Sequence, residues 1–291
     1  MLLLAGGTED PQIAHLKNRA ESRGLDHLFL DVDDSETDFF WDVRSGLVKV
    51  RNEPLNVASV FLRQNVFRYL RTKDETDSLN AQAWKGLLDG YIWANSRLRV
   101  FNRRFVLRSS VNKPLALAWA LEAGLDIPRT QIHVSRQRAL DQISEHATVY
   151  KPVTGGGYCQ VLGEDILSAF PTDRLPRPYI YQERLLSPEV RIFRVGEKFL
   201  AFRIESVELD YRSVDREKIE ITQIPPPADL VEPLRKLLDR IGLNFSAVDF
   251  KTSSDTGTLC FLEANSNPMF AAFDQVSDHA LCDAMLDWLT A

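Results

Sequence analysis

The chain has 291 residues, of which 44% are hydrophobic and 26% are charged, so it is long enough for two domains or one elaborated α/β unit. This composition excludes collagen-like, low-complexity and wholly disordered chains. The 35 Lys and Arg residues against 41 Asp and Glu give a formal net charge of -6, which disfavours a broad electrostatic nucleic-acid binder.

Cysteine content and hydropathy favour a cytoplasmic protein with no membrane partner. The three cysteines, Cys159, Cys260 and Cys282, form no C-x-x-C pair, which argues against a disulfide framework and a cysteine zinc site. No run approaches the roughly 20 apolar residues that cross a bilayer. The apolar run at residues 2–5 has no basic leader, so it indicates a first β-strand rather than a signal peptide.

The first 100 residues predict a small α/β domain. Short apolar runs that predict strands lie at residues 2–5, 28–32, 47–50 and 57–62. Apolar residues at helical spacing cover residues 11–23 and 77–94. The strand, helix and strand at the N-terminus make one βαβ unit, and the segment has the size of a single domain.

The middle of the chain alternates helices and strands. Asn112 suits an N-cap, Pro114 a first helical turn and Gly124 a helix end, so we expect a helix between them. Further elements are predicted as an extended segment at residues 127–132, a helix at 135–146 and a strand at 148–153.

Two β-hairpins and two helices are predicted for the rest of the chain. The hairpins pair residues 190–195 with 199–205, and 245–251 with 258–264. The helices cover residues 230–241 and about 274–289. The chain as a whole is therefore expected to be of the α/β (α+β) class.

Three oxygen-bearing side chains fall on the second hairpin. Glu263 and Asn265 are two residues apart in a strand, so they project from one face, and the hairpin pairing can bring Asp249 beside them. Two carboxylates and an amide suit Mg²⁺, which takes its other ligands from water and phosphate. The competing interpretation is that Asp249 and Glu263 are solvated residues on an outer sheet face, and the pattern alone does not decide between the two.

Lysines and glycines further upstream have the features of an anion site. Lys113 opens the expected helix, and Lys151 precedes a loop that contains Gly155, Gly156 and Gly157. Because glycines lack Cβ atoms, the backbone N–H groups of this loop can close over phosphates. Neither G-x-x-x-x-G-K-[ST] nor G-x-G-x-x-G occurs, and a plain mobile turn is the alternative interpretation of the glycines.

Several short motifs follow one another in a definite order. They are Asn112-Lys113, Tyr150-Lys151-Pro152, the glycine loop, Gln182-Glu183-Arg184-Leu185, Glu189-Val190-Arg191, Asp210-Tyr211-Arg212, Asp249 and Leu262-Glu263-Ala264-Asn265. From about residue 102 onward this ordered set resembles the ATP-grasp superfamily of carboxylate ligases, in its RimK-like and graspetide (microviridin-type) macrocyclase branch. The first 100 residues are similar to the pre-ATP-grasp domain of that branch.

The resemblance implies an ATP-grasp fold in three parts. These are a pre-ATP-grasp α/β domain over residues 1–100, a central subdomain with a glycine lid over 101–178, and a C-terminal subdomain with the metal site over 179–291. The implied cofactors are ATP and two Mg²⁺ ions, with Mn²⁺ as an alternative metal.

The resemblance also assigns a role to each motif position. Its nucleotide-binding residues are Lys113, Lys151, Gly155, Gly156, Gly157, Gln182, Glu183, Leu185 and Glu189. Its metal ligands are Asp249, Glu263 and Asn265, and its catalytic arginines are Arg191 and Arg212. In this assignment the lysines hold the α- and β-phosphates under the glycines, residues 182–185 line the adenine, and the carboxylate at 189 accepts from the ribose hydroxyls.

The implied reaction is ATP-dependent ligation of a carboxylate to an amine or hydroxyl through an acyl phosphate. In the graspetide branch the substrates are Asp or Glu side chains of a ribosomal precursor peptide. The alternatives are a small-substrate amino-acid or dipeptide ligase, a non-catalytic nucleotide-binding module, and an RNA-binding protein that uses the basic stretch at residues 97–108. The sequence leaves open the substrates and the oligomeric state, monomer or homodimer.

Overall fold

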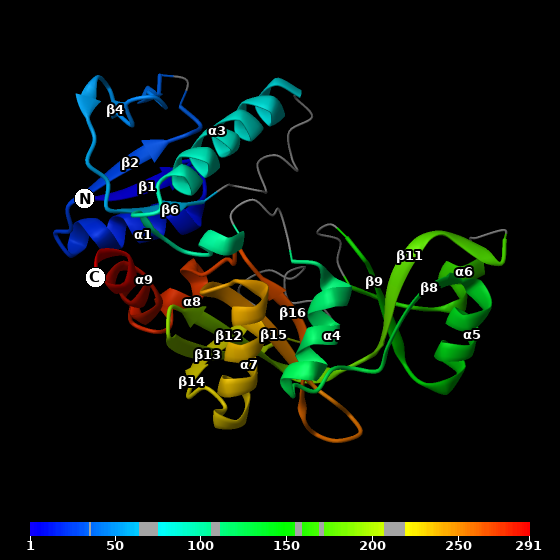
Figure 1. Cartoon of the computed structure of the whole chain (residues 1–291). Helices are drawn as coiled ribbons and strands as arrows, with labels where there is room; N and C mark the ends of the chain where they lie inside the picture. Colours follow the sequence, from blue (N-terminus) through cyan, green and yellow to red (C-terminus); the bar gives the residue numbers. More distant parts are fainter. Residues whose placement is uncertain (35, 64–74, 106–110, 155–158, 169–171, 207–218) are drawn as a thin grey trace.

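The computed structural model describes residues 1–34, 36–63, 75–105, 111–154, 159–168, 172–206 and 219–291. These residues form four β-sheets flanked by helices (Figure 1). The first and last helices lie side by side, so both chain termini are found in the same part of the molecule. No helix within the described ranges is both long and apolar enough to span a membrane.

A parallel sheet with the strand order β2-β1-β6-β7 forms the N-terminal part. Its strands are β1 Leu2–Gly6, β2 His27–Asp31, β6 Ser59–Leu62 and β7 Arg99–Val100. Its helices are α1 Pro11–Ser22 and α3 Glu75–Ala94. The central strand β1 packs against α1 on one face and α3 on the other, which explains its uninterrupted apolar run and confirms the predicted βαβ unit.

A small antiparallel sheet packs beside α3. Its strands are β3 Phe39–Trp41, β4 Val48–Val50 and β5 Glu53–Pro54. Phe39 and Trp41 both contact the ring of Tyr91 edge to face. The apolar run predicted as a strand around residues 47–50 therefore belongs to this separate sheet and not to the parallel one.

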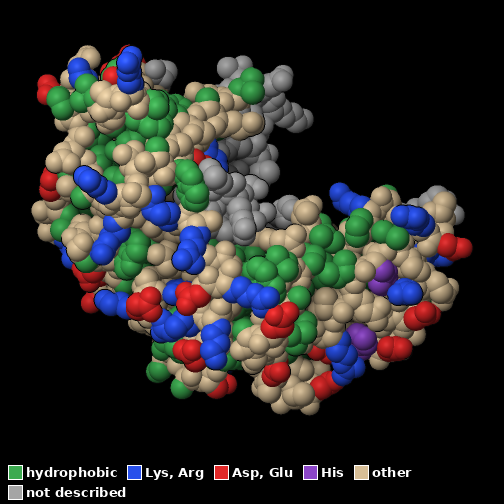
Figure 2. Space-filling view, viewed as in Figure 1, with side chains coloured by type: hydrophobic (Ala, Val, Ile, Leu, Met, Phe, Trp, Pro, Cys, Tyr) green, Lys and Arg blue, Asp and Glu red, His purple; other side chains and the backbone are tan. Residues whose placement is uncertain are grey.

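Two arginines of the basic stretch support the fold directly. Arg103, in the 3-10 helix η1 (Arg103–Phe105), donates to the Ile92 carbonyl (2.8 Å) near the end of α3. Carbonyls at a helix C-terminus lack intrahelical partners and favour a nearby cation. Arg99 donates to the Trp288 carbonyl (2.8 Å). These contacts give two of the arginines a structural role. On the face drawn in Figure 2, basic and acidic side chains are interspersed.

The central sheet is antiparallel, with the strand order β10-β9-β11-β8. Its strands are β8 Thr130–Ser135, β9 Thr148–Pro152, β10 Gln160–Val161 and β11 Arg174–Glu183. Helices α5 (Arg136–Glu145) and α6 (Glu164–Ser168) cover one face. Because β11 pairs with β8 and β9, this sheet continues to residue 183. Pairing partners distant in sequence decide this point, and local pattern does not contain them.

The C-terminal sheet has the strand order β14-β13-β12-β15-β16, with every pair antiparallel. Its strands are β12 Leu186–Val195, β13 Lys198–Glu205, β14 Glu220–Ile224, β15 Phe245–Thr252 and β16 Leu259–Asn265. Both predicted hairpins are confirmed. Helices α4 (Lys113–Ala123) and α7 (Ala228–Ile241) cover one face, while the other face packs against the N-terminal sheet and the last helices.

The prediction of one final helix is wrong, because the chain forms two. α8 (Ala271–Gln275) and α9 (Ala280–Thr290) are separated by Asp278 and His279, whose φ angles are 50° and 65°. These are left-handed backbone conformations, which interrupt a right-handed helix. Val276 lies in this break and is 45% exposed.

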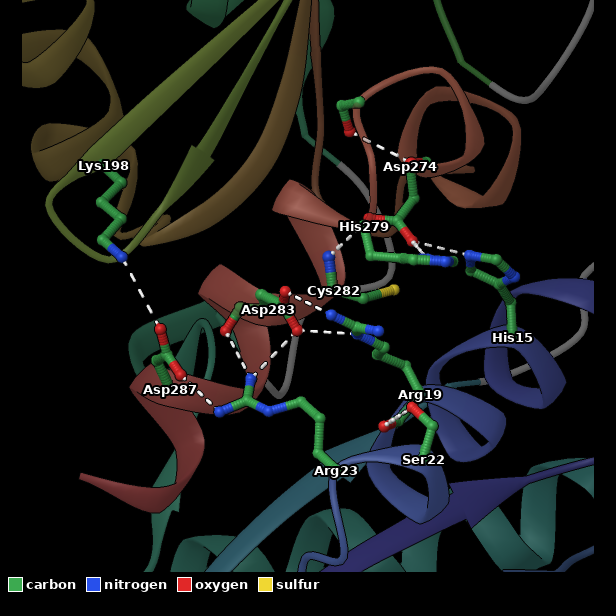
Figure 3. A network of polar contacts seen from close by, with 11 residues as sticks. His15, Arg19, Ser22, Arg23, Lys198, Asp274, His279, Cys282, Asp283 and Asp287 are labelled. Carbon is green, nitrogen blue, oxygen red and sulfur yellow. Dashed lines mark hydrogen bonds and ion pairs between the residues drawn. The ribbon is translucent and has the colours of Figure 1, made fainter.

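Asp274, near the end of α8, accepts a hydrogen bond from a backbone amide in the first turn of α9 (Figure 3). Its fully buried carboxylate accepts from the Cys282 amide (2.8 Å) and hydrogen-bonds with His15 Nε2 (2.7 Å) and His279 Nδ1 (3.1 Å). Burial raises the pKa of Asp274, but the hydrogen bonds outweigh burial and bring the pKa below its usual range. Since His15 belongs to α1, this one carboxylate ties the first helix to the last two.

Replacing Asp274 by Asn should lower the free energy of unfolding by about 1–3 kcal/mol, because buried partners lose a charged acceptor. Urea unfolding at neutral pH measures this change. The control is Asp287→Asn on α9, where the carboxylate is 51% exposed and pairs with Arg23 and Lys198, so that the loss should stay below about 1 kcal/mol. Equal losses in the two variants would contradict the capping role.

Candidate active site

Asp249, Glu263 and Asn265 share one face of the β15–β16 ladder, as predicted. Asp249 pairs directly with Glu263, and Asn265 lies two residues further along β16. Asn265 Nδ2 donates to Asp249 Oδ2 at 3.1 Å. Asp249 is 4% exposed, so the solvated outer-face interpretation does not hold for it. The three side chains form one oxygen-rich cluster.

Arg191 holds this cluster from the neighbouring strand. It is the register partner of Asp249 across β12 and β15, and its Nε and Nη2 donate to the two carboxylate oxygens at 2.6 and 2.8 Å. Its guanidinium also lies over the Phe273 ring, 5.3 Å from the centroid. A planar guanidinium that binds both oxygens restricts the rotation of a carboxylate. Arg191 therefore sets the orientation of Asp249, and its assigned role as a catalytic arginine stays a prediction.

The two predicted lysines approach β16 from different elements. Lys113 is the first residue of α4, whose start is set by the side-chain cap of Asn112. Its Nζ lies 3.8 Å from Glu263 Oε2. Lys151, on β9 and 7% exposed, places its Nζ 3.5 Å from the carbonyl oxygen of Leu262. The lysines and the acidic cluster thus lie together, as the predicted phosphate and metal sites require.

Strand β16 bulges where the lysines approach it. Asp249 faces Glu263, but the next residue, Phe250, faces Phe261, so Leu262 is skipped in the ladder. A bulge leaves its extra residue out of the ladder pairing. This irregularity explains why the Leu262 carbonyl faces the Lys151 ammonium group.

Glu189 and Lys251 form a second buried ion pair beside the cluster. They are register partners on β12 and β15, with Lys251 Nζ 3.3 Å from Glu189 Oε2. Burial and then the negative charge of Asp249 raise the pKa of Glu189 to about 7. Lys251 was missed by the sequence analysis, although its position two residues after Asp249 on a strand places both on one face.

Gln182, Glu183 and Leu185 lie where the central sheet passes into the C-terminal sheet. Gln182 Nε2 donates to Thr130 Oγ1 at 2.9 Å. The Glu183 amide donates to the Arg129 carbonyl (3.1 Å), and the Glu183 carboxylate accepts from the Arg129 amide (3.2 Å). These bonds hold the crossing between the sheets in place. In the β9–β11 register, residues 151 and 182 lie on the same face of the central sheet.

Some predicted features lie outside the described residues. They are Gly155, Gly156, Gly157, Arg212 and the part of the basic stretch from residue 106 onward. Their assigned roles stay predictions.

No protein-family model and no curated protein matches the sequence. Solved structures match it from end to end. The ATP-grasp ligase PsnB, complexed with minimal precursor, Mg and ADP, has a TM-score of 0.77 and 22% identity, with 99% of this chain and 97% of that chain covered. The macrocyclase MdnC of Microcystis aeruginosa MRC, bound with the precursor peptide MdnA, has a TM-score of 0.75 and 19% identity, with both chains covered to 100%. A RiPP-associated ATP-grasp ligase of Chryseobacterium gregarium, in complex with ADP and a leader and core peptide, has a TM-score of 0.75 and 19% identity, with 99% and 96% covered.

The chain has the ATP-grasp fold. In this chain the two sheets of the grasp contribute opposite charges to one site: Lys151 comes from the central sheet, and Asp249 and Glu263 come from the C-terminal sheet. The expected fold is therefore confirmed.

The acidic cluster fits Mg²⁺ by the chemistry of its donors. Asp249 and Glu263 offer carboxylate oxygens at facing positions of the ladder, and the Asn265 amide is hydrogen-bonded to the Asp249 carboxylate. Hard oxygen donors in small number are what Mg²⁺ takes from proteins when phosphate and water complete its shell. Arg191 and Lys113 place positive charges beside the two carboxylates.

The raised pKa of Glu189 predicts a specific pH dependence of stability. Between its ordinary pKa and about pH 7, the folded protein holds a proton that the unfolded chain releases, so the Glu189 contribution falls as pH rises through this window. Glu189→Gln removes this effect. Without divalent metal, the unfolding free energy of wild type relative to the variant should drop by up to about 3 kcal/mol between pH 4.5 and 7.5.

Urea titrations in EDTA at several pH values measure this difference. The matched control is Glu220→Gln on β14, which is an exposed carboxyl on the same sheet. A wild-type minus Glu189→Gln difference that stays constant with pH would show that Glu189 is not responsible.

Proposed function

We propose that this protein is an ATP-dependent ligase that activates a carboxylate of a peptide and joins it to an amine or a hydroxyl. The observation that carries this proposal is the meeting of Lys113 and Lys151 with Glu263 and its neighbours on β16. An ammonium pair beside an oxygen-rich metal cluster is the combination that a triphosphate needs, since phosphates bind cations directly and through Mg²⁺.

The described residues have distinct tasks in this proposal. Lys113 and Lys151 bind the α- and β-phosphates, and the crossing at Gln182 to Leu185 receives the adenine. Glu189 accepts from the ribose hydroxyls, with Lys251 holding its carboxylate in place. Asp249, Glu263 and Asn265 would hold Mg²⁺, which would neutralise charge on the phosphates. Arg191 keeps the Asp249 carboxylate fixed for that ion.

The proposed reaction has two steps. A carboxylate oxygen of the substrate attacks the γ-phosphorus, the bond from that phosphorus to the β–γ bridging oxygen breaks, and ADP leaves. An amine or hydroxyl then attacks the acyl carbon, loses its proton and expels inorganic phosphate. Fixed cations around the transferring phosphoryl group lower the barrier because they are in place before charge develops.

A peptide is the substrate class that the comparisons support. PsnB, MdnC and the Chryseobacterium gregarium ligase are each complexed with a precursor peptide or its leader and core, and each is matched over 96% or more of its length. A reaction that consumes ATP also agrees with the expected cytoplasmic location. The three predicted parts, over residues 1–100, 101–178 and 179–291, remain our proposal for the domain division.

Glu263→Gln should abolish ADP formation while the protein keeps its fold, because the change removes a metal-binding charge and no core contact. The assay combines ATP and Mg²⁺ with a synthetic peptide that carries Asp or Glu together with Thr, Ser or Lys side chains, and follows both ADP and the loss of one water per bond in the peptide mass. Glu205→Gln on β13, with a side chain 52% exposed, serves as the control and should retain activity. Full activity in Glu263→Gln would contradict the metal assignment.

A further inference from the structure

The loop that joins β16 to α8, residues 266–270, directly follows the proposed metal ligand Asn265. It contains Asn267 and Pro268 and packs against residues from the first part of the chain. Its position decides where the end of β16 lies, and so where the side chain of Asn265 stands. The contacts that hold this loop therefore affect the position of a proposed metal ligand.

Arg63, at the end of β6, makes the central contact with this loop. Its Nη1 donates to Asn267 Oδ1 and to the Pro268 carbonyl, both at 2.7 Å. Its Nε donates to Asp10 Oδ2 at 2.9 Å. The arginine is 1% exposed and Asp10 is 2% exposed, so the ion pair is buried. A rigid guanidinium fixed at one end by a carboxylate can hold two acceptors of a loop at defined positions.

Two further side chains hold the same loop at its ends. Gln12 Oε1 accepts from the amides of Phe270 (2.6 Å) and Ala271 (2.7 Å). Asn102 Nδ2 donates to the Ser266 carbonyl at 3.1 Å. The loop is thus held at its beginning, middle and end by side chains that come from α1, β6 and the segment after β7, none of which belongs to the C-terminal sheet.

A second ion pair also joins the N-terminal part of the chain to its last helices. The two parts are therefore held together by more than the contacts of Arg63. Arg19 on α1 binds both carboxylate oxygens of Asp283 on α9, at 2.7 and 2.8 Å (Figure 3). That pair joins the first helix to the last one through Asp283, which lies outside the loop. Arg63, by contrast, bonds to the loop that follows the metal ligand.

We propose that Arg63 is a positioning residue for the metal site: it fixes the β16–α8 loop and thereby the placement of Asn265 and Glu263. This inference rests on the proposed function, because it assumes that these side chains bind the metal ion. It makes the N-terminal part of the chain a component of metal binding, although that part supplies no metal ligand itself.

The test measures Mn²⁺ binding in the presence of ADP, by the electron paramagnetic resonance signal of free Mn²⁺. The main variant is Asp10→Asn with Arg63→Met, which removes both charges so that no carboxylate is left buried and unpaired, and which keeps an amide oxygen for the cap of α1. We expect Mn²⁺ affinity to fall about 10-fold or more, as for other residues that orient metal ligands. The conservative variant Arg63→Lys should bind Mn²⁺ more tightly than the main variant but less tightly than wild type.

Two controls separate positioning from general stability. Arg19→Gln should lower the unfolding free energy but leave Mn²⁺ affinity within about twofold of wild type. Gln12→Met, which loosens the other end of the loop without burying a charge, should weaken Mn²⁺ binding in the same direction as the main variant and gives an answer if that variant does not fold.

The outcomes distinguish this inference from the proposed function. Wild-type Mn²⁺ affinity in folded Arg63 and Gln12 variants, or an equal loss in Arg19→Gln, overturns the positioning role while the ligase proposal stands. A wild-type protein that binds no Mn²⁺ with ADP overturns the metal site itself, and the positioning role with it.

Discussion

The register between β15 and β16 is the constraint on which the site depends. Asp249 and Glu263 are neighbours only because the strands are aligned at that point, and the ladder slips by one residue immediately afterwards. If the ladder slipped by one residue at Asp249 itself, Glu263 would turn toward the apolar face that α4 and α7 cover. Val248 and Phe250, buried on that face, flank Asp249 and oppose such a slip. Core packing and site geometry are therefore determined by the same strand pairing.

A large part of this arrangement follows from local sequence pattern. The apolar alternation of the two C-terminal hairpins and the cap and end signals of α4 predict elements that the structure contains. The two-residue spacing of Glu263 and Asn265 predicts their common face. These features depend on neighbours within a few residues, which is the range over which propensity and periodicity carry information.

What the sequence could not predict depends on contacts between distant segments. Strand β11 pairs with β8 and β9, and no local signal shows that residues 179–183 belong to that sheet. The break between α8 and α9 is held by Asp274, whose partner His15 lies near the other end of the chain. Arg63 likewise finds Asn267 only after the whole fold has formed. Side-chain partners so far apart cannot be inferred from one sequence without the arrangement of the sheets.

A single hydrophobic core contains residues from both ends of the chain. Leu4 and Ile13 pack in the same cluster as Phe193 on β12 and Leu289 on α9. The N-terminal sheet and the last helices therefore depend on each other for burial of their apolar surfaces, even though they are remote in sequence. If the N-terminal part were exchanged between proteins of this fold, the matching C-terminal helices would have to be exchanged with it. Separating the two would expose the apolar residues of this cluster to water.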